Sequence, residues 1–178
     1  MTNTHSSLSY SDERDKTYGV TGMAITLVVL DGEQYLTNIN LDGEAAELIE
    51  LSHDFGFKGN PRMSAKIVWE QTLKDLRLSA SMAIGNVACR RYILAHKSLS
   101  REDTECLRSA LRQDAVEHCG LDFDETDRLF DSCLSYVDRI FRHNGVADIA
   151  NAFATRLSER RTLSGVEAVE LLASLGIG

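Results

Sequence analysis

A long stretch without helix breakers follows the single proline of the chain, and this feature constrains the fold more than any other. Asn60 and Pro61 suit the N-cap and the first position of a helix, respectively. From there to Lys97, Gly85 is the only residue that would weaken a helix. Apolar residues recur at helical spacing throughout. The stretch therefore predicts one long helix, or two helices joined near residues 76–79.

A stripe of small side chains runs along this stretch. Ser81, Gly85 and Cys89 lie four residues apart, so they share one face of a helix. Small residues on one face allow a second helix to approach closely. We expect Gly85 to lie where a buried central helix packs tightly against a neighbour.

Start and stop signals divide the rest of the chain into shorter helices. Ser100 and Ser164 are N-cap residues, and Ser100 forms a capping pattern with Asp103. Gly120 and Gly145 are typical stops. The predicted helices span about residues 100–120, 125–142, 146–157 and 164–175. Short connections between them favour antiparallel neighbours in a bundle.

The N-terminal part has a different pattern. Residues 1–19 are polar and without apolar periodicity, which predicts a disordered or loosely attached arm. Residues 23–30 are apolar on both faces, a turn pair follows at residues 31–32, and residues 34–40 alternate. This arrangement predicts a β-hairpin at residues 22–40. A short helix is expected at residues 42–54.

These patterns together predict a mainly α protein. We expect a helical bundle of five or six helices preceded by an N-terminal β-hairpin, with residues 20–178 forming a single domain.

Charge and hydropathy exclude several classes of partner. The net charge of −8 argues against nucleic acid as a partner, because binding phosphates requires surplus lysine and arginine. The longest apolar run is too short to span a bilayer, and the first residues do not resemble a secretory signal. We therefore expect a cytoplasmic protein without a membrane partner.

One segment has a net positive charge, although the chain as a whole is acidic. Residues 58–97 hold eight basic and two acidic residues. This segment either packs among acidic neighbours of the same fold or forms a surface that faces anions.

Two sets of residues are candidates for binding. Arg90, Arg91 and His96 lie at the end of the long predicted helix, and guanidinium groups suit carboxylates and phosphates. This set could bind a small anionic ligand. Surface ion pairs with acidic neighbours would explain the same arginines.

The second set is a candidate metal site. Glu50 and His53 have the E-x-x-H spacing of one half of a di-iron site, and His118 could add a ligand. The sequence contains no second E-x-x-H pair. The four cysteines lack the spacing of a zinc site and are expected to be free thiols.

The function that this pattern favours is protein binding. We expect a non-catalytic helical protein without a cofactor, and the sequence contains no nucleotide-binding or hydrolase motif that would argue against it. The predicted hairpin, which is apolar on both faces, and the stripe of small residues favour a homodimer, although the partner could be another protein. Two alternatives remain open: a bundle that binds a small anionic ligand or catalyses an unidentified reaction, and a metal-dependent enzyme.

Overall fold

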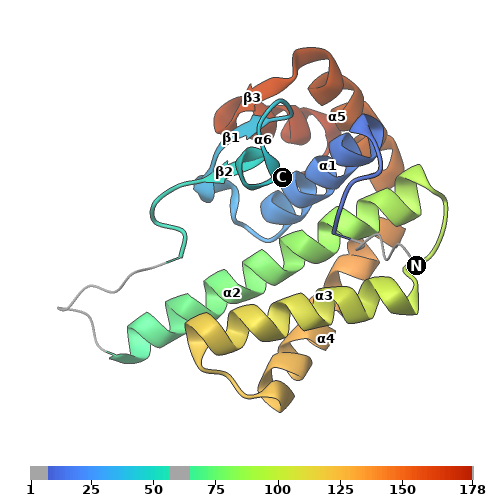
Figure 1. Cartoon of the computed structure of the whole chain (residues 1–178). Coiled ribbons are helices and arrows are strands. Elements are labelled where there is room, and N and C mark those ends of the chain that lie inside the picture. The colour runs from blue at the N-terminus through green and yellow to red at the C-terminus, as the bar shows by residue number, and fades with distance from the viewer. Residues whose placement is uncertain (1–7, 57–64, 178) are drawn as a thin grey trace.

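The computed structural model describes residues 8–56 and 65–177 of the chain. Within them, helices dominate and a small antiparallel sheet lies at one end of the molecule (Figure 1). The prediction of a mainly α protein, a helical bundle with an early β-hairpin, is confirmed. The position of the hairpin is not the predicted one.

The described residues form six α-helices and three strands. The helices are α1 (Glu13–Val29), α2 (Ala65–Ala88), α3 (Arg101–Asp114), α4 (Phe123–Arg142), α5 (Val146–Arg160) and α6 (Gly165–Leu175). The strands are β1 (Leu36–Asn40), β2 (Ile49–Leu51) and β3 (Thr162–Ser164). Helices α2 and α3 continue into π-helical turns at Cys89–Leu94 and Ala115–Cys119, respectively.

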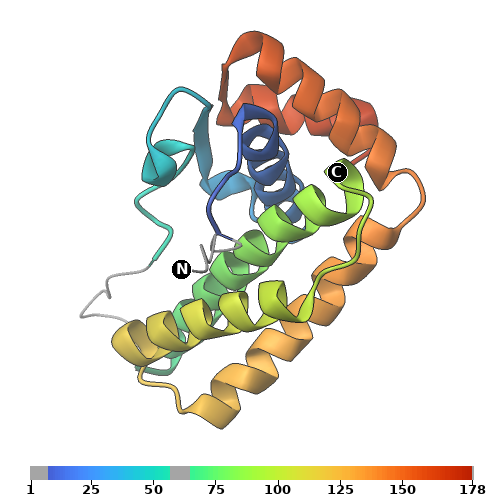
Figure 2. The same ribbon diagram turned by 45° about the vertical axis from the view of Figure 1, so that its right-hand side comes forward.

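The elements divide into two halves that α1 and α2 join. Helices α2, α3 and α4 gather in one half, and α1, α5, α6 and the sheet form the other (Figures 1 and 2). Helix α1 packs against α2 on one side and against α5 and α6 on the other. It is therefore a central helix of the molecule.

The prediction for residues 13–29 was wrong, because they form α1 instead of an arm and a first strand. Val20, Ile25 and Leu27 are fully buried, and Asp12 caps the helix. A helix buried on all sides shows no amphipathic period, so its sequence resembles a two-faced strand. The rest of the predicted arm, residues 1–7, lies outside the described residues.

The hairpin is formed by β1 and β2, not by residues 22–40. The predicted strand at residues 34–40 contains β1, but residues 49–51 pair with it from the segment expected to be a short helix. Strand β3 pairs with the other edge of β1, giving the order β2-β1-β3. Asp31 does turn the chain, with a φ of 54°, but the turn follows a helix.

Of the two alternatives for the long stretch, the structure shows one helix, and the close contact at Gly85 was predicted correctly. Helix α2 runs without a break through residues 76–79, while the expected start at residues 60–61 lies outside the described residues. A Cβ atom on Gly85 would lie 2.0 Å from Oγ1 of Thr26, and one on Gly22 would lie 2.1 Å from the carbonyl oxygen of Gly85. Only glycines allow α1 and α2 to approach this closely.

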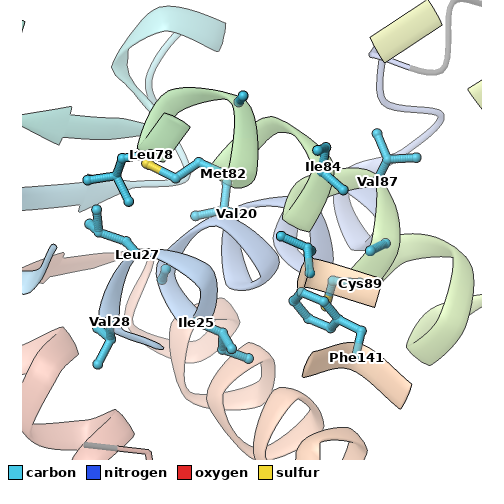
Figure 3. Close-up of a cluster of buried hydrophobic side chains, with 14 of the residues drawn as sticks. Val20, Ile25, Leu27, Val28, Leu78, Met82, Ile84, Val87, Cys89 and Phe141 are labelled. Carbon is cyan, nitrogen blue, oxygen red and sulfur yellow. The ribbon is translucent and has the colours of Figure 1, made fainter. Parts of the chain in front are cut away.

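Apolar side chains of α1 and α2 surround this contact. Figure 3 shows them in one buried cluster together with Phe141 of α4. Thr26 satisfies its hydroxyl within the contact, because Oγ1 donates to the carbonyl oxygen of Gly22 at 2.7 Å. Among the described residues, no helix is both long and apolar enough to cross a membrane.

The substitution Gly85→Ala tests the close contact. On an open helix face it would stabilise the protein by about 1 kcal/mol, because alanine has the higher helix propensity. Here we expect a loss of about 1–3 kcal/mol, since the added methyl group meets Thr26 and the backbone of Gly22. Urea unfolding monitored by circular dichroism measures the change.

The control places Thr26→Ala in the same background. Removing the hydroxyl should recover part of the stability that Gly85→Ala loses, because the two positions are in contact. A Gly85→Ala variant more stable than the wild-type protein would contradict the contact.

Candidate functional site

The predicted anion-binding arginines hold parts of the protein together. Arg90 is buried, and its Nε and Nη2 atoms donate to both carboxylate oxygens of Asp15, at 2.7 and 2.6 Å. Nη2 also donates to the carbonyl oxygen of Ser9 at 2.7 Å. The guanidinium group therefore anchors the start of α1 and the segment before it to the π-helical turn.

Arg91 makes a similar pair with α3. Its Nε and Nη2 atoms donate to the carboxylate of Asp103 at 3.0 and 2.8 Å. The same carboxylate accepts the backbone N–H of Ser100 in the predicted capping box. His96 lies beyond the π-helical turn, exposed and with a left-handed φ of 52°. The anionic-ligand hypothesis stays a prediction, and this geometry gives it no support.

The pair of Arg90 and Asp15 changes the acidity of the carboxyl group. Burial alone would raise the pKa of Asp15, but hydrogen bonds from Arg90 and Ser11 to the ionised form outweigh it and hold the pKa below its usual value. The carboxylate is therefore ionised, and the pair is a true ion pair at neutral pH.

The predicted metal ligands lie on different elements. Glu50 is exposed on β2 and His53 follows in a turn, so the E-x-x-H spacing does not form a helical half-site. His118 is exposed in the turn after α3, where Nδ1 lies 3.1 Å from the carbonyl oxygen of Asp114. In the part of the chain that the structure describes, no three His, Cys, Asp or Glu side chains are placed to hold a metal ion.

A groove between α2 and α4 is the candidate that the sequence did not reveal. It consists of two adjoining hollows, of about 480 and 300 Å³, that share Leu73, Arg77 and Ser132. From Trp69 to Ser81, the groove follows α2 for about 18 Å, at 1.5 Å per residue. Its lining residues are Leu30, Trp69, Glu70, Leu73, Lys74, Arg77, Leu78, Ser81, Leu121, Glu125, Arg128, Leu129, Ser132, Cys133 and Tyr136. We call this surface the α2–α4 groove.

Two exposed aromatic residues line the α2–α4 groove. Trp69 belongs to one hollow and is 42% exposed, and Tyr136 belongs to the other and is 40% exposed. Leucines from α2 and α4 line the same two hollows. The groove therefore combines an apolar floor with large aromatic side chains that remain in contact with solvent.

The three cations that line the groove differ from its carboxylates in their partners. Lys74, Arg77 and Arg128 make no ion pair with any described residue, whereas Glu70 pairs with Lys66 at 3.7 Å. The carboxylate of Glu125 accepts the backbone N–H of residue 122 in a capping box. Glu70 therefore has a basic partner within the protein, whereas Glu125 has a backbone donor and keeps its negative charge.

The basic residues at positions 58–97 have two kinds of surroundings in the structure. The two C-terminal arginines of this segment, Arg90 and Arg91, pair with acidic neighbours inside the fold. Lys74 and Arg77 instead face the groove without a carboxylate partner. The excess of basic residues at positions 58–97 is visible in the sequence. The sequence does not show which of these residues remain without an ion pair, nor that a groove lies beside them.

Comparisons of the chain with family models, curated proteins and solved structures found no match.

Asp15→Asn tests the buried pair. Removing one charge leaves the guanidinium group of Arg90 buried without its counter-ion, so we expect a loss of about 3–5 kcal/mol at neutral pH. Arg156→Ala is the control, because its pair with Glu159 is exposed and should contribute less than about 1 kcal/mol. Urea unfolding of the three proteins provides the comparison.

The stability difference between the wild-type protein and Asp15→Asn should depend on pH. The pKa of Asp15 is lower in the folded protein than in the unfolded chain. The ion pair therefore makes its full contribution to the stability of the fold at pH values above the ordinary aspartate pKa of about 3.9. The contribution disappears as the pH falls through the lowered value. The stability difference between wild type and Asp15→Asn should therefore narrow in acid, and a difference independent of pH would contradict an ionised pair.

Proposed function

We propose that this protein is a non-catalytic helical protein that acts by binding another protein, and that the α2–α4 groove receives an amphipathic helix of that partner. The observation that carries the proposal is the exposed pair of aromatic residues, Trp69 and Tyr136, above an apolar floor. Tryptophan, tyrosine and arginine dominate the binding energy of many protein interfaces.

The shape of the groove supports a helical ligand. A length of about 18 Å corresponds to about three helical turns. A helix that places apolar residues three and four positions apart could set them between Trp69 and Tyr136, against the leucines of the floor. Its polar face would remain in solvent.

The chemistry of the groove supports binding over catalysis. Cys133 is the cysteine among its lining residues, and the thiol lies 3.7 Å from the carbonyl oxygen of Arg77. Burial raises the pKa of this thiol, so it is protonated at neutral pH and a poor nucleophile.

A partner other than a second copy of the chain is favoured by two arguments. The two features that suggested a homodimer, residues 23–30 and the stripe at Gly85, pack inside the chain. Symmetric pairing through the groove would also bring Lys74, Arg77 and Arg128 close to their own copies, and like charges repel.

Trp69 is the single tryptophan of the chain, so its emission reports on the groove alone. We expect a blue shift when the full chain is titrated with a synthetic amphipathic peptide of four turns, with leucine on one face and glutamine on the other. Ser132→Tyr, which fills the shared part of the groove, should weaken this binding at least about tenfold, or about 1.4 kcal/mol.

Ser135→Tyr is the matched control, because Ser135 is exposed on the same helix and does not line the groove. Peptide binding that Ser132→Tyr leaves unchanged, or no shift at all, would refute the groove. Light scattering gives the remaining outcome: if the mass doubles and the emission of Trp69 shifts with protein concentration alone, the partner is a second copy.

A further inference from the structure

We infer that the α2–α4 groove selects an acidic partner helix, one that carries carboxylates on both flanks of its apolar face. This inference rests on the proposed function above. Lys74 and Arg77 line the groove from α2, and Arg128 lines it from α4. A helix lying in the groove would therefore meet a cation on either side, with three cations against the carboxylates of Glu70, which pairs with Lys66, and Glu125.

Lysines and arginines without a carboxylate partner are concentrated at the groove. The chain has 27 acidic and 19 basic residues, and most arginines and lysines in its described part contact a carboxylate. Of the seven that do not among the described residues, four lie at the groove. They are Lys74, Arg77, Arg128 and Arg139, and the guanidinium group of Arg139 lies over the ring of Tyr136, 5.5 Å from its centroid. Carboxylates from outside the chain would give these groups the partners that other arginines have.

The field around the groove is local. Charges in solution interact over about 8 Å at physiological salt, so a short bound segment is sensitive mainly to the cations beside it. A long polyanion would extend over the rest of the surface, where the net charge of −8 repels it. The leucine floor also offers a helix an apolar contact that a phosphate backbone does not use. A carboxylate-bearing helix fits both properties better than nucleic acid does.

The expected partner segment follows from these positions. It spans about three turns, presents apolar residues at positions i, i+3 or i+4, and i+7, and places aspartate or glutamate next to them on each side. The cations are exposed or at the rim, so they should govern the rate of association and the choice of partner more than the total affinity.

The test compares three peptides that share one leucine face and differ in their flanks, which carry glutamate, glutamine or lysine. Emission of Trp69 in the full chain gives the affinity of each. At low salt, the glutamate peptide should bind at least about tenfold more tightly than the lysine peptide, and 0.5 M salt should reduce the difference.

Charge reversal of the groove gives the decisive comparison. The triple variant Lys74→Glu, Arg77→Glu and Arg128→Glu should bind the lysine peptide more tightly than the glutamate peptide. The matched control, Lys97→Glu, Arg101→Glu and Arg156→Glu, changes the net charge equally at exposed positions outside the groove and should keep the original order. Circular dichroism confirms that both variants fold.

The outcomes separate the two proposals. Equal affinity for the three peptides, with a shift that Ser132→Tyr blocks, would overturn the acidic preference and leave the groove as a protein-binding site. If no peptide shifts the emission of Trp69, both proposals fail. A single-stranded oligoribonucleotide that binds the groove more tightly than the glutamate peptide at physiological salt would replace the acidic helix with nucleic acid.

Discussion

The close approach of α1 and α2 is the constraint on which the other contacts depend. Gly22 and Gly85 remove the side chains that would hold the two helices apart. Because the backbones nearly touch, the start of α1 reaches the π-helical turn after α2, where Arg90 binds Asp15. At the other end of the contact, Leu30 reaches the α2–α4 groove. One helix crossing therefore positions both the buried ion pair and one wall of the candidate site.

The parts of the fold that the sequence predicted are those with local signals. Capping residues such as Ser100 and Ser164 mark helix starts, and both form the capping boxes of the structure. The spacing of Ser81, Gly85 and Cys89 identified the close contact on α2. Helix α1 was missed because burial on every side removes its period. Strands β2 and β3 have three residues each, too few to show alternation, and only tertiary pairing with β1 defines them.

The candidate site was harder to predict because it depends on which charges meet. Arg90 and Arg77 belong to one basic segment and are the same residue type, yet one is buried against Asp15 and the other faces the groove. The difference arises from elements far apart in the chain, since α1 supplies the carboxylate to Arg90. The groove likewise needs α4, which brings Arg128 and Tyr136 beside α2. Sequence supplies the residue types, whereas their pairing follows from the packing.

The pairing of β3 with β1 has a consequence for how the chain folds during synthesis. The central strand, β1, meets one neighbour from residues 49–51 and the other only from residues 162–164. Helix α1 also needs α5 and α6 to cover one side, and these follow more than a hundred residues later. Contacts of such long sequence separation form slowly. A nascent chain therefore exposes an apolar helix until α5 and α6 leave the ribosome, and in that interval it is open to chaperones and to aggregation.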